Sequence, residues 1–205
     1  MLGLIDMERF NLFKPVDIHV ILKVGDWLAE TSWFKRFYNK ALQKESCRSM
    51  AQKNYHGYHP PLAELEKYPS NTLGYQYSQF IIKNNLTVYE RKNPQTLNGP
   101  LYFRERSREF HDIIHVVYGF GVTMQDEMGI NSVIIAQHKY PMSAVIIIGG
   151  LIQILFTQIR SLPLALKKIS RGLSLGSKSE SVFAIAWEDY WMSDLESLRQ
   201  QMNVY

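Results

Sequence analysis

The chain has 205 residues, a formal net charge of +4 and one cysteine, Cys47. This length is enough for one domain with a sizeable hydrophobic core, and a single cysteine excludes an internal disulfide and indicates a reducing compartment. The sequence pI of about 9.0 favours an anionic partner or a membrane surface. The chain lacks the dense Lys/Arg stripe of a nucleic-acid-binding protein, so we expect no nucleic-acid partner.

The N-terminal segment carries Asp6 and Glu8 among its first ten residues. This is unlike a secretory signal or a mitochondrial transit peptide, and it favours a bacterial protein or a mature form. Residues 16–50 have near-helical apolar spacing and predict one or two helices. The run His56-Gly-Tyr-His59-Pro-Pro that follows is a predicted loop, because prolines do not continue a helix.

Further helices are predicted over residues 62–67 and 73–82, then a loop around residues 93–100 and a longer helix over residues 101–118. Strand-like alternation is scarce and short, so we expect no sheet. The predicted fold class is therefore all-α, a single helical domain over residues 1–205 with roughly seven to nine helices.

The helix predicted over residues 101–118 carries the run His111-Asp112-Ile-Ile-His115, and Glu127 follows twelve positions later. His111 and His115 are four positions apart and therefore project from one face of a helix. Imidazole nitrogen and carboxylate oxygen together suit zinc, iron or magnesium. We therefore predict a divalent-metal site, with zinc as the first choice and magnesium or iron as alternatives.

Glu127 is expected to face the two histidines from the first turn of the next helix. Gly119 is a good place for the motif helix to end, and Thr123-Met-Gln-Asp126 has the pattern of a capping box. Asp112 lies about 100° around the helix from the first histidine, so it could ligate at the edge of the site or orient a histidine ring. The alternative is that these are ordinary histidines and that Glu127 only complements the helix dipole.

The twenty residues between Lys139 and Arg160 carry no charge. Such a stretch fits a buried central helix, which could line a lipid tunnel, a helix in a membrane interface, or a membrane span. Two adjacent mid-helix glycines weaken a helix, which suggests that another helix or a ligand approaches there. We expect a hydrophobic lipid-binding tunnel or groove. Its predicted lipid-contacting residues are Val145, Ile148, Gly149, Ile152 and Phe156.

Residues 162–171 mix apolar and basic side chains. This mix fits an anionic membrane surface or a pyrophosphate-headed lipid, with a solvated helix end as the alternative. Residues 170–181 are rich in Gly, Ser and Lys and predict a mobile loop. Apolar residues at helical spacing then predict a final helix that begins near Val182 and includes Met202.

The metal-ligand run reads His111-Asp112-x-x-His115, eleven residues, then Glu127. Residues 68–74 (Tyr-Pro-Ser-Asn-Thr-Leu-Gly) precede it and residues 187–191 (Trp-Glu-Asp-Tyr-Trp) follow it. In this order the segments resemble the coenzyme Q (ubiquinone) biosynthesis protein 4 family, whose hallmark is His-Asp-x-x-His, eleven residues and Glu. The resemblance covers roughly residues 60–200 and is loose over the first fifty residues.

This resemblance implies a role in ubiquinone biosynthesis, with N-terminal helices over residues 1–55 and a family-like core over residues 60–205. It implies a metal-dependent enzyme that replaces the C1 carboxyl of a polyprenylated benzoate by hydroxyl, which is an oxidative decarboxylation. The catalytic and metal-binding roles would then fall to the same four residues, namely His111, Asp112, His115 and Glu127.

Two other functions stay open. A non-catalytic lipid-binding scaffold could organise a membrane-associated quinone-biosynthesis complex, and a His-Asp phosphohydrolase would use His56 or His59 upstream of its His-Asp doublet. The expected partners are a polyprenyl or other long-chain lipid, other quinone-biosynthesis enzymes, a membrane surface and a second copy of the chain. The expected location is cytoplasmic, peripherally at the inner face of a membrane, or the matrix side of the mitochondrial inner membrane in a eukaryote.

Overall fold

The computed structural model describes residues 23–25, 27, 28, 30–89 and 99–205. Within these residues the chain forms nine α-helices and three short 3-10 helices, and its β-pairing is one isolated bridge. The predicted all-α class is confirmed. The acidic N-terminal segment and the first part of the helix prediction for residues 16–50 lie outside the described residues.

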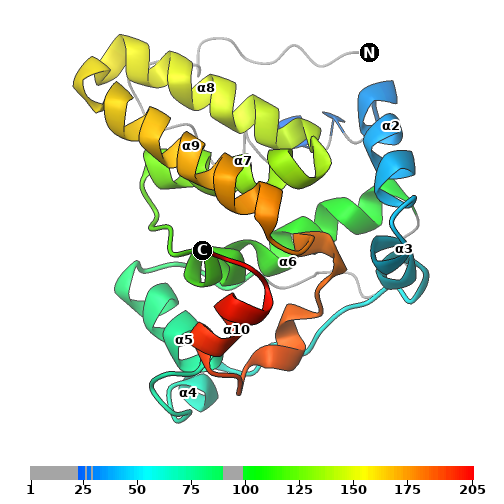
Figure 1. Cartoon of the computed structure of the whole chain (residues 1–205), viewed down its shortest axis with the longest axis vertical. Coiled ribbons are helices and arrows are strands. Elements are labelled where there is room, and N and C mark those ends of the chain that lie inside the picture. Colours follow the sequence, from blue (N-terminus) through cyan, green and yellow to red (C-terminus); the bar gives the residue numbers. More distant parts are fainter. Residues whose placement is uncertain (1–22, 26, 29, 90–98) are drawn as a thin grey trace.

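In chain order the helices are α2 (Ser32–Ala41), α3 (Glu45–Gln52), α4 (Leu62–Leu65), α5 (Leu73–Lys83), α6 (Pro100–Tyr118), α7 (Met124–His138), α8 (Pro141–Thr157), η2 (Ile159–Ser161), α9 (Leu162–Lys178), η3 (Val182–Ala184), η4 (Trp187–Tyr190) and α10 (Leu195–Gln201). Figure 1 shows α7, α8 and α9 side by side at one end of the molecule and α4, α5 and α10 at the other. The long helix α6 lies between these two groups, with α2 and α3 along one side.

Helix α6 is the central helix of the fold and is buried on most of its circumference. Twelve of its nineteen residues are buried, where a surface helix would bury a single stripe. Neighbouring helices therefore hold its side chains from several directions. The predicted helix over residues 101–118 is confirmed to within one residue.

One continuous core joins the N-terminal helices to the rest of the chain. Phe37 of α2 packs edge-on against Phe103 of α6 and tilted against Phe183 of η3. Cys47 of α3 is a free, buried thiol in the same core. The division between N-terminal helices and a family-like core at residues 55–60 stays a prediction.

Helices α7 and α9 approach each other more closely than ordinary side chains permit. A Cβ atom on Gly172 would lie 2.1 Å from the backbone oxygen of Gly129, and one on Gly176 would lie 2.5 Å from that of Val133. Only glycine fits at two such points, since real Cβ atoms do not approach that closely. The mobile loop predicted over residues 170–181 is therefore wrong up to residue 178: the glycines there serve helix packing, and α9 continues through them.

Helix α8 has one face on the core and one face exposed. Gly150 and Ile154 are buried toward α7, where Met128 lies. On the opposite face a Cβ atom on Gly149 would have nothing within 4 Å, and Phe156 is 66% exposed. Of the options given by the sequence for this uncharged stretch, a buried central helix thus describes only the face of α8 toward α7. No described helix combines the length and hydropathy that a membrane span needs.

The C-terminal segment departs from the predicted single helix. Residues 182–190 form η3 and η4, and the α-helix α10 begins only at Leu195, where the Asp194 side chain accepts a hydrogen bond from the Ser197 N–H. The indole N–H of Trp187 donates to the Val182 carbonyl, which stabilises a compact non-α path. Most of the apolar residues in this segment are buried as expected, although tertiary contacts rather than helical periodicity account for their burial.

Candidate metal centre

The two histidines of the predicted site lie on successive turns of α6. The ring centroids of His111 and His115 are 4.7 Å apart. Thr123 is the N-cap of α7, and its hydroxyl accepts a hydrogen bond from the backbone N–H of Asp126. This confirms the predicted cap and places Glu127 in the first turn of α7, facing back across a short turn toward α6.

Three of the four predicted ligands come together. His111, His115 and Glu127 each offer one ligand atom, and these atoms all lie within 4.8 Å of one another. Nε2 of His111 lies 3.4 Å from Oε2 of Glu127, and Nε2 of His115 lies 3.4 Å from Oε1. An edge of about 3.4 Å is what a tetrahedron with metal–ligand bonds of about 2.1 Å requires, so the two distances to Glu127 fit a zinc-sized ion.

The second nitrogen of each imidazole is held by an acceptor. Nδ1 of His115 lies 2.8 Å from the backbone oxygen of Gly121, and Nδ1 of His111 lies 3.1 Å from Oδ1 of Asp112. A carbonyl or carboxylate oxygen only accepts, so the hydrogen of each neutral ring belongs on Nδ1. In these neutral rings each Nε2 directs a lone pair toward the Glu127 carboxylate, an arrangement that is favourable only with a positive charge among the three groups, either a proton on a ring or a metal ion.

The pKa shifts of His111 and Glu127 also indicate that the site favours a positive charge. Burial disfavours the protonated form of His111, but the carboxylates of Glu127 and Asp112 outweigh it and raise the pKa of His111 well above its usual range. Burial would raise the pKa of Glu127, yet the neighbouring His111 lowers that pKa well below its usual range. Either a proton or a metal ion can supply this charge.

Asp112 is close to the site without belonging to the ligand cluster, and its observed contact is with the ring of His111. Of the two roles predicted for it, orienting a histidine therefore agrees with the geometry. The site is open on one side, since the side chains of His111 and Glu127 are each 34% exposed. His115 is buried, and the ring of Phe80 on α5 stacks over it.

The turn between α6 and α7 is held by contacts with distant arginines that the sequence does not predict. Gly119 ends α6 in the left-handed conformation, with φ of 65°. Arg171 of α9 donates to the carbonyls of Tyr118 and Gly119, and Arg199 of α10 donates to two carbonyls of the preceding turn. These guanidinium groups satisfy the carbonyls that a helix end leaves without partners.

Lys168 also points toward this turn. Its Nζ lies 2.6 Å from Oδ1 of Asp126. The cations of Lys168 and Arg171 both lie over the ring of Phe120, at 5.7 and 4.5 Å from its centroid. The sequence prediction for residues 162–171 is contact with an anionic membrane or lipid headgroup, or a solvated helix end. Two of their cations, Lys168 and Arg171, hold the loop that carries the Gly121 carbonyl, and the contact with a membrane or lipid stays a prediction.

His56 and His59 have partners away from the ligand cluster. Nδ1 of His56 lies 2.9 Å from Glu109, and Nε2 of His59 lies 3.2 Å from Glu188. Both carboxylates also bind the guanidinium of Arg106, which is completely buried. The structure thus gives these two histidines a second polar network and does not add them to the candidate metal centre.

A model of the family described as coenzyme Q (ubiquinone) biosynthesis protein Coq4 matches residues 5–205. A mitochondrial ubiquinone biosynthesis protein COQ4 homolog of Aedes aegypti is 31% identical over 147 residues, covering 68% of this chain and 51% of that protein. The mitochondrial ubiquinone biosynthesis protein COQ4 of Saccharomyces cerevisiae (strain AWRI1631) is 24% identical over 208 residues, covering 95% of this chain and 58% of that protein. The chain therefore spans half to three fifths of these relatives.

The fold also has a solved counterpart. The crystal structure of a protein from Nostoc punctiforme PCC 73102, named for ubiquinone biosynthesis, superposes with a TM-score of 0.83 at 23% identity. The match covers 90% of this chain and 87% of that one. At this identity the likeness establishes a shared fold.

Proposed function

The chain belongs to the coenzyme Q (ubiquinone) biosynthesis protein Coq4 family, because the family model matches residues 5–205, and we propose that it acts on a polyprenylated ring intermediate of ubiquinone biosynthesis at a divalent-metal centre. The observation that carries this proposal is the convergence of two imidazole Nε2 atoms and one carboxylate. All three are acceptors when the Nδ1 atoms carry the ring hydrogens, so they suit a metal ion.

His111, His115 and Glu127 would hold the ion, with zinc as the first choice and magnesium or iron as alternatives. When bound, the metal supplies a Lewis acid for a carboxylate or phenolate oxygen, and iron with two histidines and a carboxylate would also permit oxygen chemistry. Asp112 and the Gly121 carbonyl keep both rings in the ligating tautomer. The exposed side of His111 and Glu127 leaves an approach for the substrate ring.

The proposed reaction replaces the C1 carboxyl of a polyprenylated benzoate by hydroxyl. The bond between C1 and the carboxyl carbon breaks and CO2 leaves, the hydroxyl oxygen comes from water, and O2 accepts the two electrons released and becomes hydrogen peroxide. The part of this chain is to bind and orient the carboxylate at the open side of the site. Catalytic roles for His111, Asp112, His115 and Glu127 are part of this proposal.

An exposed apolar surface on α8 supports a lipid or membrane partner. Ile148, Ile152 and Phe156 are 58%, 42% and 66% exposed, and Gly149 lies beside them. Val145 is half-buried against the core. Contiguous exposed apolar side chains on one helix are typical of a surface that contacts lipid or another protein. We propose that this surface receives the polyprenyl tail at the face of a membrane, where other quinone-biosynthesis enzymes and a second copy of the chain would assemble.

The test combines metal content and turnover in the full chain. The purified protein is expected to hold about one divalent ion per chain and, in air, to release CO2 from a polyprenylated 4-hydroxybenzoate and form the ring hydroxyl. Glu127→Gln removes a ligand charge and should abolish both, while Glu196→Gln, an exposed control on α10, should change neither. Wild-type protein that holds no metal and stays inactive after zinc, magnesium or iron is added would contradict the proposal.

A non-catalytic scaffold is the second candidate, and the exposed apolar surface of α8 favours it independently of the metal. Copurification of a polyprenyl or other long-chain lipid, together with recruitment of quinone-biosynthesis enzymes to vesicles and no turnover, would support it. The two functions are compatible, so each needs its own measurement. Vesicle recruitment reports on the scaffold, and CO2 release reports on the enzyme.

A further inference from the structure

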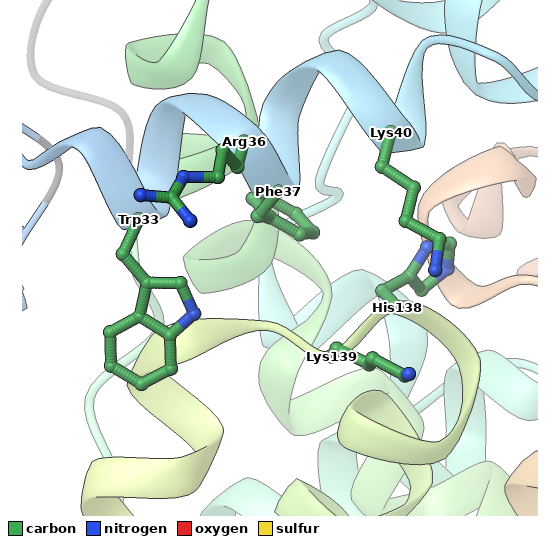
Figure 2. Close-up of a pocket in the computed structure, with 6 residues that line it drawn as sticks. All are labelled: Trp33, Arg36, Phe37, Lys40, His138 and Lys139. Carbon is green, nitrogen blue, oxygen red and sulfur yellow. The ribbon is translucent and has the colours of Figure 1, made fainter.

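A shallow pocket of about 150 Å³ lies where α2 meets the corner between α7 and α8. Figure 2 shows the six residues that line it. Four of them, Trp33, Arg36, Phe37 and Lys40, come from one face of α2, since they are spaced three and four positions apart. The other two, His138 and Lys139, are the end of α7 and the residue after it.

The rim of this pocket is positively charged. Arg36, Lys40 and Lys139 are exposed, and the pocket lining contains no carboxylate. None of these three cations makes an ion pair with any residue in the described ranges, in contrast to Arg106 or Lys168. Three unpaired cations around one depression create a positive potential that attracts anions.

The floor of the pocket is buried and carries no compensating negative charge. Phe37 is part of the core. His138 is also buried, and its Nε2 lies 2.7 Å from the hydroxyl oxygen of Ser181. Burial and the nearby cation of Lys44 lower the pKa of His138 to about 3, so the ring is neutral. An anion on the rim would therefore meet cations and an uncharged floor.

We propose that this pocket is a binding site for a phosphate group, separate from the metal centre. A phosphate ester carries about two negative charges and three acceptor oxygens, and three cationic side chains line the pocket, Arg36 beside Trp33 and the two lysines beside His138 (Figure 2). The planar guanidinium of Arg36 suits two phosphate oxygens, while Lys40 and Lys139 act as point charges. His138 lies eleven positions after Glu127 on α7, which is about 16 Å of helix, so the two sites occupy opposite ends of that helix.

The phosphate could belong to a soluble ester or to the headgroup of a phospholipid. Trp33 is 47% exposed at the rim, and an exposed tryptophan beside basic residues is typical of a membrane-contacting surface. The chemistry of recognition is the same for both sources. Separate arms of one experiment distinguish them.

The first arm titrates the full chain with inorganic phosphate by calorimetry, with chloride as the reference anion. The triple variant Arg36→Gln/Lys40→Gln/Lys139→Gln changes only exposed side chains and removes the rim charge. Its matched control, Lys53→Gln/Lys67→Gln/Lys178→Gln, removes the same charge from exposed positions elsewhere. We expect saturable phosphate binding that weakens by at least about tenfold in the rim variant, keeps its strength in the control and falls with added salt.

The second arm measures flotation with phosphatidylcholine vesicles with and without phosphatidic acid. A loss of acid-dependent binding in the rim variant alone assigns the phosphate to a lipid headgroup, and equal vesicle binding by both variants assigns it to a soluble ester. A third measurement needs no variant: inorganic phosphate should shift the NMR signals of the His138 ring and leave those of His59 unchanged. The proposal is overturned if neither arm shows saturable binding, if the control loses as much as the rim variant, or if the His138 signals do not move.

Discussion

Nε2 of His115 and Oε1 of Glu127 lie 3.4 Å apart across the turn that joins α6 to α7. The Nε2 atom is buried and has no hydrogen-bond partner among the described residues, while Nδ1 of the same ring is bound to the Gly121 carbonyl. A buried acceptor that faces a carboxylate is unfavourable unless a cation lies between them. The surroundings of this pair therefore give the most direct tests of the metal centre.

The first prediction concerns metal content. Glu127→Gln keeps the shape of the side chain but removes the negative charge that two imidazoles share, so the purified variant should hold no stoichiometric metal. Elemental analysis by mass spectrometry measures this directly. Undiminished metal in Glu127→Gln, with Glu196→Gln treated identically, would count against the site.

The second prediction separates ligands from orienting groups. Asp112→Asn leaves all three ligand atoms in place and weakens only the contact that orients the His111 ring. Its metal affinity should fall by about 10- to 100-fold, as it does when other metal-bound histidines lose their hydrogen-bond partners. Competition with a chromophoric chelator measures the change. Complete loss of metal would instead make Asp112 a ligand, and Asp189→Asn, exposed and remote in sequence, should have no effect.

The third prediction concerns stability at acid pH. Glu188 and Arg106 are both buried and share two hydrogen bonds, of 2.5 and 2.9 Å. Burial would raise the pKa of Glu188, but the contacts with His59 and Arg106 outweigh it and lower that pKa from 4.5 to about 2. The ionised Glu188 carboxylate therefore stabilises the folded protein fully above pH 4.5, and this contribution is lost as the pH falls toward 2. The unfolding free energy should change by an amount on the order of 3 kcal/mol over this range.

Urea unfolding at a series of pH values tests this window. Glu188→Gln should reduce the unfolding free energy at neutral pH by about 3 kcal/mol or more, because it leaves Arg106 with one carboxylate fewer. The same variant should show a smaller loss of stability between pH 4.5 and 2 than the wild type. Glu196→Gln breaks an exposed pair with Arg199 and should cost less than about 1 kcal/mol with no change in that slope. Equal slopes for wild type and Glu188→Gln would refute the assignment.

The fourth prediction uses two glycines with opposite surroundings. Gly172→Ala would place a methyl group against the backbone of Gly129, so α9 must shift and unfolding should become easier by about 1–3 kcal/mol or more. Gly149→Ala adds a methyl group in open space on α8 and should stabilise the protein by about 0.4–1 kcal/mol. Thermal and denaturant unfolding of both variants measures the difference, and the same sign for both would contradict the close packing of α9 on α7.

The fifth prediction concerns the apolar surface of α8. Phe156→Asp puts a charge at its most exposed aromatic residue and should reduce flotation with lipid vesicles several-fold, without loss of helical content. Met192→Asp is the matched control, because Met192 is similarly exposed but lies in the C-terminal segment. Equal flotation of Phe156→Asp and wild type would exclude this surface as the membrane contact.

The parts of the site that could be predicted from the sequence depend on short-range geometry. His111 and His115 share a helix face because of their spacing, and Thr123 caps the next helix through a contact three residues away. Such contacts are visible in the local pattern. The same local pattern predicts Glu127 near the histidines, and the structure brings the three groups together.

The features that could not be predicted depend on residues distant in the sequence. In the sequence Gly172 looks like part of a loop. Its role is visible only in the structure, where the backbone of Gly129 on α7 leaves no room for a side chain at this position of α9. Arg171 looks like a surface cation, although it binds carbonyls 52 and 53 positions earlier. No local pattern encodes the partner of either residue, and the buried Arg106 gives no signal for the same reason.

The α6–α7 ligand set also bears on the order in which the chain can assemble. The three ligands span seventeen residues, so closing the loop between them costs little conformational entropy. The partner of Arg106, by contrast, is Glu188, which lies 82 positions later in the chain. During synthesis the three candidate ligands are complete about sixty residues before Glu188 emerges. If the proposed site binds a metal ion at that stage, the ion would link α6 to α7 before the C-terminal segment arrives to close the domain.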